Sequence, residues 1–196
     1  MVKRLFDIIF SFTFLILLSP LFIYLSFIIW LHDKGSVFFL QERVGKDQKT
    51  FKLVKFRTMY LNSEKKGQLT IGSRDSRITK PGLFLRKYKI DELPQLWNVL
   101  VGDMSLVGPR PEVPRYVKMY NTEQLKVLTI KPGITDHASL LYFEESELLA
   151  KSPNPEQTYI AEVMPAKLKL NLDYIDNHSF TKDLIIICKT VQRMFS

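Results

Sequence analysis

The chain has little of what many catalytic and structural sites are built from. Its 196 residues include one cysteine, Cys188, and three histidines. A single cysteine cannot form an internal disulfide, and its apolar surroundings predict a buried, unreactive thiol. The histidines are scattered at positions 32, 137 and 178 without metal-ligand spacing, and no paired motif supports a Ser/His/Asp or Cys/His site.

Glycine-rich nucleotide fingerprints, internal repeats and low-complexity tracts are also absent from the sequence. Acidic residues are outnumbered, with 20 Asp and Glu against 28 Lys and Arg, and the formal net charge is +8. This imbalance favours anionic partners: nucleic acid, anionic lipid headgroups or phosphorylated small molecules. Because no nucleic-acid-binding motif accompanies the basic residues and the N-terminus is apolar, we expect no nucleic-acid partner.

The N-terminus is one nearly continuous apolar run over residues 5–31, in which Asp7 is the only charged residue. As a helix it would extend roughly 40 Å, enough to cross a hydrocarbon core of about 30 Å. A signal peptide fits poorly, because the run is too long and lacks a small-residue cleavage site. We therefore expect a membrane segment at 1–33, and the Lys/Arg surplus after residue 33 favours a cytoplasmic location for the rest.

Ser19 and Pro20 interrupt the middle of this run. Proline has no N–H to bond the carbonyl four residues back, and its ring crowds the preceding turn. Two topologies stay open. One is an ordinary kinked transmembrane helix, which the residues alone slightly favour. The other is a helix–break–helix that enters one leaflet and returns to the same side.

Residues 34–196 are predicted to form one domain of the α/β class, mostly helical with a small β-hairpin. The hairpin would pair arms at about 36–43 and 50–59 through a turn at 45–47. Side chains alternate along a strand, so one face of the second arm should carry Phe51, Leu53, Lys55 and Arg57. The two cations would give this face a phosphate-binding edge, although Lys55 alone could equally be solvated.

Beyond a predicted loop at 61–82, helical spacing of apolar residues indicates amphipathic helices at about 113–129, 160–176 and 180–195. The last two helices carry basic residues beside their apolar stripes: Lys167, Lys169, Lys182, Lys189 and Arg193. Basic amphipathic helices either pack on a core or lie at a membrane surface. Since a membrane segment is already expected, we favour the surface location.

Asp91 and Glu92 come immediately before a predicted short helix that begins at Pro94. Acids are common helix caps, so a purely structural role is the simple interpretation. However, Arg86 lies just upstream and Arg110 is framed by two prolines, and guanidinium groups grip phosphate oxygens bidentately. This combination favours phosphoryl transfer, in which a carboxylate can act as nucleophile and adjacent carboxylates can hold Mg²⁺.

An ordered series of short motifs runs through about the first 135 residues. After the apolar N-terminus with its Ser19-Pro20 come the stretches at 41–45, 55–59, 85–86, 91–100, 102–105, 107–112 and 131–135. The central stretch begins Asp91-Glu92-Leu93-Pro94. Together and in this order, the motifs resemble the monotopic phosphoglycosyl transferases, also called bacterial sugar transferases, and the chain looks like their minimal catalytic type.

The resemblance implies a re-entrant N-terminal helix, broken at Ser19-Pro20, at the cytoplasmic face of the bacterial inner membrane. It implies a UDP-sugar as donor and polyprenyl phosphate, such as undecaprenyl phosphate, as acceptor. The reaction would be the first membrane step of glycan assembly. A re-entrant anchor would place the site where a water-soluble donor and a lipid acceptor can both reach it.

The same resemblance implies roles for the site residues. Asp91 would attack the sugar-linked phosphate, forming a phospho-aspartyl intermediate and releasing UMP. Glu92 would assist, either through Mg²⁺ held with Asp91 or in a deprotonation. Phosphate would be gripped or lined by four basic residues: Lys55, Arg57, Arg86 and Arg110.

The chain departs from much of the family after Thr135, where Asp136-His137-Ala138-Ser139-Leu140 replaces a Gln-Val-Asn-Gly-like stretch. This departure concerns the donor sugar more than the reaction class. A second function stays open, a catalytically silent adaptor whose basic helices bind anionic membrane lipids. The ordered polar series between residues 55 and 110 counts against it, because an adaptor needs no paired acids beside phosphate-binding groups.

Overall fold

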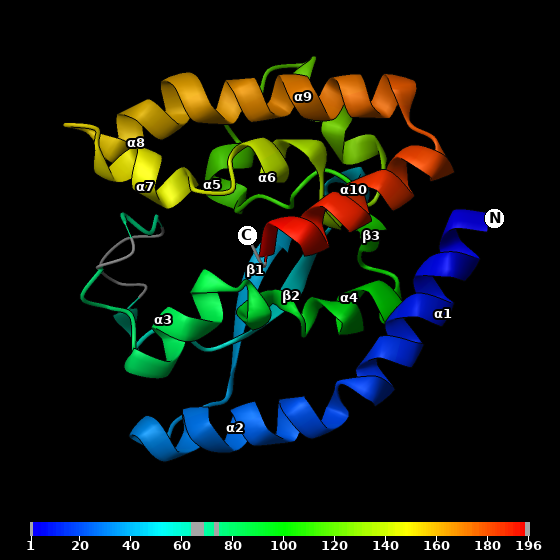
Figure 1. Cartoon of the computed structure of the whole chain (residues 1–196). Helices are drawn as coiled ribbons and strands as arrows, with labels where there is room; N and C mark the ends of the chain where they lie inside the picture. The colour runs from blue at the N-terminus through cyan, green and yellow to red at the C-terminus, as the bar shows by residue number, and fades with distance from the viewer. Residues whose placement is uncertain (1, 64–68, 73–74, 195–196) are drawn as a thin grey trace.

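The computed structural model describes residues 2–63, 69–72 and 75–194. Its α-helices and strands are, in chain order, α1 (Val2–Leu17), α2 (Ser19–Asp33), β1 (Phe38–Val44), β2 (Thr50–Phe56), α3 (Lys80–Lys87), α4 (Gln95–Val101), β3 (Ser105–Val107), α5 (Pro114–Val117), β4 (Gly133–Thr135), α6 (His137–Leu141), α7 (Glu145–Ala150), α8 (Pro155–Thr158), α9 (Met164–Asn177) and α10 (Phe180–Met194). Figure 1 shows α2 and α9 on opposite sides of the molecule, with the hairpin, α3, α4, α6 and α10 between them. The predicted class, mostly helical with small sheets, is confirmed.

The apolar N-terminus forms two helices that meet at a 60° bend (Figure 1). The break falls at Ser19 and Pro20, where the proline removes a backbone donor and the Ser19 hydroxyl donates to Ile16 O at 2.8 Å. Within the described residues no single helix is long and apolar enough to cross a membrane. Taken together, α1 and α2 form one bent pair with sufficient length and apolar composition. The structure thus has a sharper break than the single kinked helix that the residues alone favoured.

Polar residues fasten α1 to the globular part of the chain. The buried Asp7 carboxylate accepts from the Ser105 hydroxyl at 2.8 Å and from the Leu106 N–H at 3.1 Å. Arg4 donates to the carbonyls of Val99 and Leu100 at 2.6 and 3.0 Å, at the C-terminal end of α4. The charges in this apolar segment therefore serve docking, which a free membrane helix would not require.

The predicted hairpin is confirmed, with β1 and β2 antiparallel from Phe38↔Phe56 to Val44↔Thr50. The second sheet pairs β3 and β4 in parallel. A Cβ on Gly133 would come within 2.1 Å of the Gly108 nitrogen, so only glycine allows the backbones to approach this closely. Asn98 of α4 fastens the hairpin, since it donates to Lys52 O at 2.8 Å and accepts from Val54 N at 3.0 Å.

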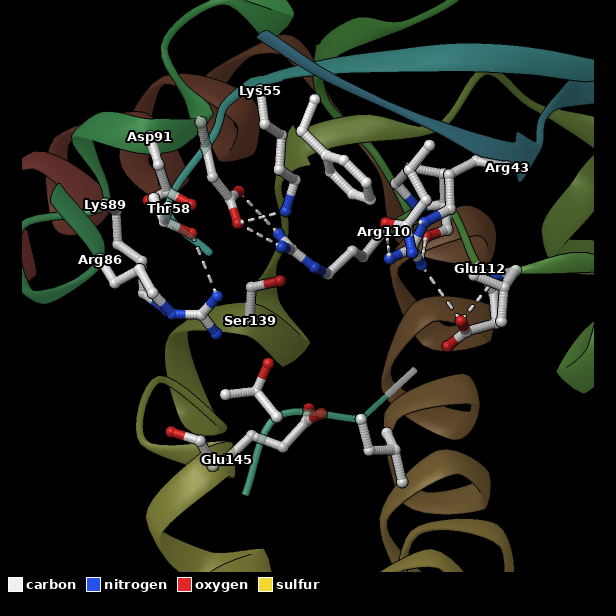
Figure 2. A pocket seen from close by; sticks show the side chains of 18 of the residues that line it. Arg43, Lys55, Thr58, Arg86, Lys89, Asp91, Arg110, Glu112, Ser139 and Glu145 are labelled. Atoms are coloured by element: carbon white, nitrogen blue, oxygen red, sulfur yellow. Dashed lines mark hydrogen bonds and ion pairs between the residues drawn. The ribbon is translucent and has the colours of Figure 1, made fainter. Parts of the chain in front are cut away.

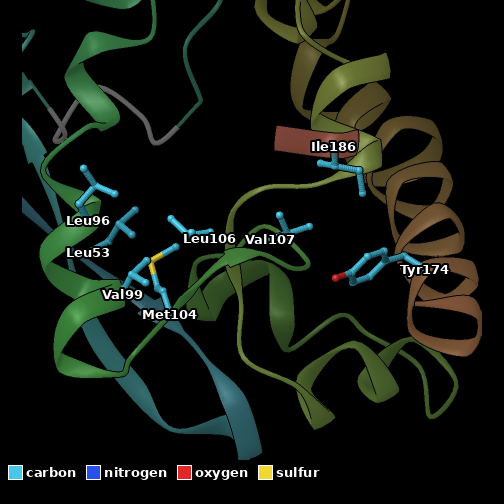
Figure 3. Packing of buried hydrophobic residues seen from close by; sticks show 8 residues of the cluster. All are labelled: Leu53, Leu96, Val99, Met104, Leu106, Val107, Tyr174 and Ile186. Carbon is cyan, nitrogen blue, oxygen red and sulfur yellow. The ribbon is translucent and has the colours of Figure 1, made fainter. Parts of the chain in front are cut away.

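One apolar cluster joins the hairpin, α4, β3, α9 and α10 (Figure 3). Its buried members are Leu53, Leu96, Val99, Met104, Leu106, Val107, Tyr174 and Ile186. Burying side chains from elements far apart in sequence provides the main stabilising term for this arrangement. It also fixes the start of α4 against β2, which positions the residues described below.

The helix predicted at 113–129 is wrong. The structure has only the short α5, then a 3-10 helix, Gln124–Thr129. Asn121 and Gln124 exchange side chain–backbone hydrogen bonds at 2.8 and 3.0 Å, and this local box begins a new turn instead of continuing the old one. The predicted loop at 61–82 lies partly outside the described residues, and α3 begins within it at Lys80.

The two C-terminal helices are confirmed as α9 and α10, and a π-helical turn at Tyr159–Val163 precedes α9. Cys188 is exposed on α10, so its predicted burial is wrong. Periodicity explains the error, because α10 turns Asp183 and Ile186 toward the interior instead. Lys167 of α9 is also not at the surface: its side chain is 13% exposed and pairs with Glu145.

Candidate active site

Asp91 and Glu92 lie in a short 3-10 helix, Ile90–Glu92, directly before α4. Pro94 is the N-cap residue of α4, so the helix begins at Gln95, one position after the predicted start. Lys89 adopts a left-handed backbone with φ of 53°, which ends α3 sharply and turns the next residues inward. The side chains of Asp91 and Glu92 consequently line a cavity between the hairpin and the C-terminal helices, and Figure 2 shows Asp91 at its edge.

Glu92 is held between two cations, Lys55 and Arg110. Lys55 Nζ donates to Glu92 Oε1 at 3.0 Å, and Arg110 grips both carboxylate oxygens, with Nη1 3.0 Å from Oε2. Burial works to raise the pKa of Glu92, but Arg110 and Lys55 outweigh it and hold that pKa well below its usual range. Glu92 is therefore a fixed anion that orients two cations along the cavity wall.

The backbone of Arg110 is as constrained as its side chain. Pro109 and Pro111 flank it, and its N–H donates to Asp136 Oδ2 at 2.8 Å. Asp136 is fully buried and also accepts from the Ser139 N–H at the start of α6. One carboxylate thus connects the Arg110 segment to α6, which turns a flexible guanidinium into a positioned one.

Asp91 is buried, and its Oδ1 accepts no hydrogen bond from any residue that the structure describes. Burial and the neighbouring Glu92 raise the pKa of Asp91, against the opposing effect of Lys55, Arg86 and Lys89. An unpartnered carboxylate oxygen in a buried position costs free energy. Such a group, facing a cavity and surrounded by cations, has the features of a reacting or ligand-binding carboxylate.

Arg86 and Lys89 form the opposite rim of the cavity (Figure 2). Arg86 comes from the last turn of α3, and its Nη1 lies 3.4 Å from the Thr58 hydroxyl. Thr79 caps α3 by accepting from Gly82 N at 3.0 Å. Burial lowers the pKa of Lys89. Lys89 was not among the predicted site residues, although a basic residue two positions before Asp91 could have indicated it.

Arg57 lines the cavity, but its guanidinium is paired elsewhere. It forms a salt bridge with Asp33, at the C-terminal end of α2. The side chain is 6% exposed, and its Nη1 finds no partner within the described ranges. Strand alternation placed Arg57 beside Lys55, but β2 ends at Phe56, so the next residue no longer follows the alternation.

A second polar network, missed in the sequence, continues the wall beyond Arg110. Arg43 donates to Pro111 O at 2.9 Å and to Glu112 Oε1 at 3.1 Å, and the Tyr159 hydroxyl donates to the other Glu112 oxygen. Burial, reinforced by Glu112, raises the pKa of Tyr159. Arg43, Pro111 and Glu112 lie within the motif stretches at 41–45 and 107–112, so the sequence did contain a signal for this network.

The cavity has a volume of about 1090 Å³. Small-molecule sites commonly occupy about 300–1,000 Å³, so a ligand as large as a nucleotide sugar would fit. No three His, Cys, Asp or Glu side chains gather as a metal-binding group in the described part of the chain. Both oxygens of Glu92 are occupied by cations, which leaves Asp91 as the carboxylate that could bind Mg²⁺ together with phosphate oxygens of a ligand.

Several known proteins are similar to this chain over most of its length. The chain is 36% identical to the UDP-N-acetylgalactosamine-undecaprenyl-phosphate N-acetylgalactosaminephosphotransferase of Aeromonas hydrophila, over 100% of this chain and 44% of that protein. It is 38% identical to the UDP-glucose:undecaprenyl-phosphate glucose-1-phosphate transferase of Klebsiella pneumoniae, over 98% of this chain and 40% of that protein. It is also 38% identical to the sugar transferase EpsL of Bacillus subtilis strain 168, over 98% of this chain and 86% of that protein.

The chain therefore spans less than half the length of the Aeromonas and Klebsiella proteins and most of the length of the Bacillus protein. The family described as bacterial sugar transferase matches residues 1–196, which is the whole chain. The resemblance based on the ordered motifs is thus confirmed: the chain belongs to the bacterial sugar transferase family.

Proposed function

We propose that the protein transfers a sugar-1-phosphate from a UDP-sugar to polyprenyl phosphate and releases UMP. The observation that carries the proposal is the buried Asp91, whose unpartnered Oδ1 lies among Lys55, Arg86 and Lys89. The names of the relatives from Aeromonas and Klebsiella, both undecaprenyl-phosphate sugar phosphotransferases, support the reaction class. Positioning and charge neutralisation provide most of the catalysis in phosphoryl transfer, and this site supplies both.

In the first step an Asp91 carboxylate oxygen attacks the sugar-linked phosphorus of the donor. The new O–P bond forms as the bond to the bridging oxygen breaks, and UMP leaves with that oxygen. Lys55 and Arg110, held by Glu92, and Arg86 on the facing rim neutralise the phosphates. When bound, Mg²⁺ would add charge neutralisation at the diphosphate, held by Asp91 and phosphate oxygens.

In the second step a phosphate oxygen of the polyprenyl phosphate attacks the phosphorus of the phospho-aspartyl group. The acyl phosphate O–P bond breaks, which releases Asp91 as a carboxylate and forms the polyprenyl-diphosphate sugar. Splitting one transfer into two is a recognised use of a covalent intermediate. The cations that held the first diphosphate serve the second one without rearrangement.

The pH dependence of kcat/KM follows from Lys55. Burial lowers its pKa to about 8, against the raising effect of Glu92. Above that pH the cation is lost, so kcat/KM for UMP release should fall about tenfold per pH unit. A Lys55→Arg variant should move this alkaline limb upward by a pH unit or more, since arginine stays protonated. Lys52→Arg, an exposed change on the same strand, should leave the limb in place, and an unmoved limb in Lys55→Arg would contradict the assignment.

The N-terminal helices are proposed to re-enter the cytoplasmic leaflet of the bacterial inner membrane. Both ends of the bent pair contact the same globular domain: Lys3 forms a salt bridge with Asp183, and Asp33 forms one with Arg57. A spanning segment would separate its ends by about 30 Å of hydrocarbon and could not make both contacts. This topology brings the membrane-borne acceptor and the soluble donor to one site.

Cysteine labelling tests this topology in sealed vesicles. Cys188 is exposed on α10 and reports the side of the catalytic domain. In a Cys188→Ser background, Val2→Cys should react with an impermeant maleimide from the same side as Cys188 does in the unaltered protein. Reaction of Val2→Cys only from the opposite side would show that the segment spans the membrane.

The adaptor hypothesis is tested with the transferase activity. Purified protein is given polyprenyl phosphate, Mg²⁺ and a panel of UDP-sugars, and UMP is measured. Release with at least one donor supports the proposal. An adaptor predicts no release with any donor and vesicle binding that high salt abolishes, whereas an inserted anchor keeps its binding at high salt.

A further inference from the structure

The part of the cavity that faces the phosphate-binding residues is lined by polar side chains with no role in the proposed steps. Ser139 comes from α6, Glu145 from α7, and Lys167 and Asn171 from α9. Figure 2 shows Ser139 and Glu145 below Lys55 and Arg110 in this view, with Glu145 across the cavity from Asp91. These residues lie after Thr135, in the part of the chain that follows the ordered motifs.

Asn171 is the clearest sign of a binding site. The residue is 4% exposed, yet its Oδ1 is buried and accepts no hydrogen bond from the residues described. A buried amide oxygen without a partner is destabilising, because it loses its hydrogen bond to water. An unpaired group of this kind is usually explained by a missing ligand or water, and here it lines a cavity.

Ser139 also has a buried polar atom without a partner, and it lines the same cavity as the phosphate-binding groups. Its buried hydroxyl has no partner in the ranges described, while its N–H is held by Asp136. The same Asp136 carboxylate holds the backbone of Arg110. The Ser139 hydroxyl is therefore set at a fixed position relative to Arg110, next to the place where a donor phosphate would lie.

The charges here suit a neutral, hydroxyl-rich group. The side chains of Glu145 and Lys167 are largely buried and form a salt bridge with each other, so the pair has no net charge. A carboxylate accepts hydrogen bonds only, whereas the edge of a uracil ring offers two carbonyl acceptors and one N–H donor. A sugar ring offers several hydroxyl donors, which match Glu145 and the amide oxygen of Asn171, and acceptors for Lys167.

We infer that Ser139, Glu145, Lys167 and Asn171 form the subsite that binds the sugar ring of the UDP-sugar and selects among donors. This inference rests on the proposed function, because that function supplies the donor. It adds the position of the transferred sugar: under α6, α7 and α9, to the side of the attacked phosphorus, because the leaving UMP must lie in line with Asp91. The nucleoside end of the donor then lies outside these four residues.

Calorimetry on the full chain tests the inference in an Asp91→Asn background, in which the donor can bind but cannot react with the protein. Dissociation constants are measured for a panel of UDP-sugars and for UDP, which lacks the sugar. Asn171→Leu should weaken the tightest UDP-sugar about tenfold or more, and leave the Kd of UDP within about twofold. Because leucine removes an unpaired buried amide, the variant should unfold at the same or a higher temperature, which separates lost binding from lost folding.

Lys167→Met provides a second variant with the same expected pattern, and Lys169→Met, exposed on the same helix, is its matched control. Equal weakening of UDP and UDP-sugars, or unchanged binding of every UDP-sugar in both variants, would overturn the subsite. Selective loss of UDP-sugar binding in the variants, without UMP release by the unaltered protein, would support the subsite and contradict the transferase function. UMP release with unchanged donor selectivity in both variants would support the transferase function and contradict the subsite. No binding of any UDP-sugar would contradict both.

Discussion

Replacing Asp91 by asparagine is expected to lower kcat for UMP release by about 10⁴-fold or more, as losses of a covalent nucleophile do. The amide has nearly the shape of the carboxylate but cannot displace UMP from phosphorus. Since Asp91 Oδ1 accepts no hydrogen bond from the described residues, no hydrogen bond of that atom is lost in the change. The measurement is UMP release with the preferred donor and polyprenyl phosphate, alongside thermal unfolding of both proteins.

Asp47→Asn is the matched control. Asp47 is exposed in the turn of the hairpin, at a φ of 56° that asparagine also tolerates. It should keep full activity and stability. Retention of more than a few per cent of activity in folded Asp91→Asn would exclude Asp91 as the nucleophile, whatever the behaviour of the control.

Arg110→Lys should lower kcat/KM by about 10²-fold, the effect expected when a positioned charge-stabilising group is lost from an active site. Lysine keeps the charge but is a single-point donor, whereas Arg110 contacts both oxygens of Glu92. The change leaves Glu92 Oε2 without its donor and lets the remaining cation move. Phosphate is then neutralised less well as charge develops in the transition state.

The control for Arg110→Lys is Arg115→Lys. Arg115 also pairs with a glutamate, Glu156, but both side chains are about half exposed, and exposed pairs contribute little. The control should stay within about twofold of the unaltered protein. An Arg110→Lys variant with equally small losses would mean that the paired geometry of Arg110 and Glu92 has no catalytic importance.

The parts of the fold and site that were predictable depend on local chemistry. Alternation and a turn predicted the hairpin, Pro94 predicted the start of α4 to within one residue, and Pro109 and Pro111 indicated a rigid Arg110. Residues close in sequence can report on each other. The cluster of Lys55, Glu92 and Arg110 was predicted as a set of phosphate-binding and catalytic residues, and the structure brings all three together.

What could not be predicted depends on contacts between distant segments. Asp33 and Arg57 are 24 positions apart, and nothing local shows that this arginine is paired with α2. The periodic pattern placed Lys167 at the surface because it contains no information about Glu145, the salt-bridge partner of Lys167 on α7. The helix expected at 113–129 failed for a local reason, since the reciprocal bonds of Asn121 and Gln124 outweighed apolar spacing.

Mass spectrometry of the intact protein, mixed with the preferred UDP-sugar and Mg²⁺ but no acceptor, tests the two-step mechanism most directly. The account predicts that the protein gains the mass of one sugar-phosphate group. Polyprenyl phosphate should remove this mass, and Asp91→Asn should never acquire it. Turnover with both substrates but no adduct in the donor-only mixture, or an adduct that persists in Asp91→Asn, would contradict a phospho-aspartyl intermediate at Asp91.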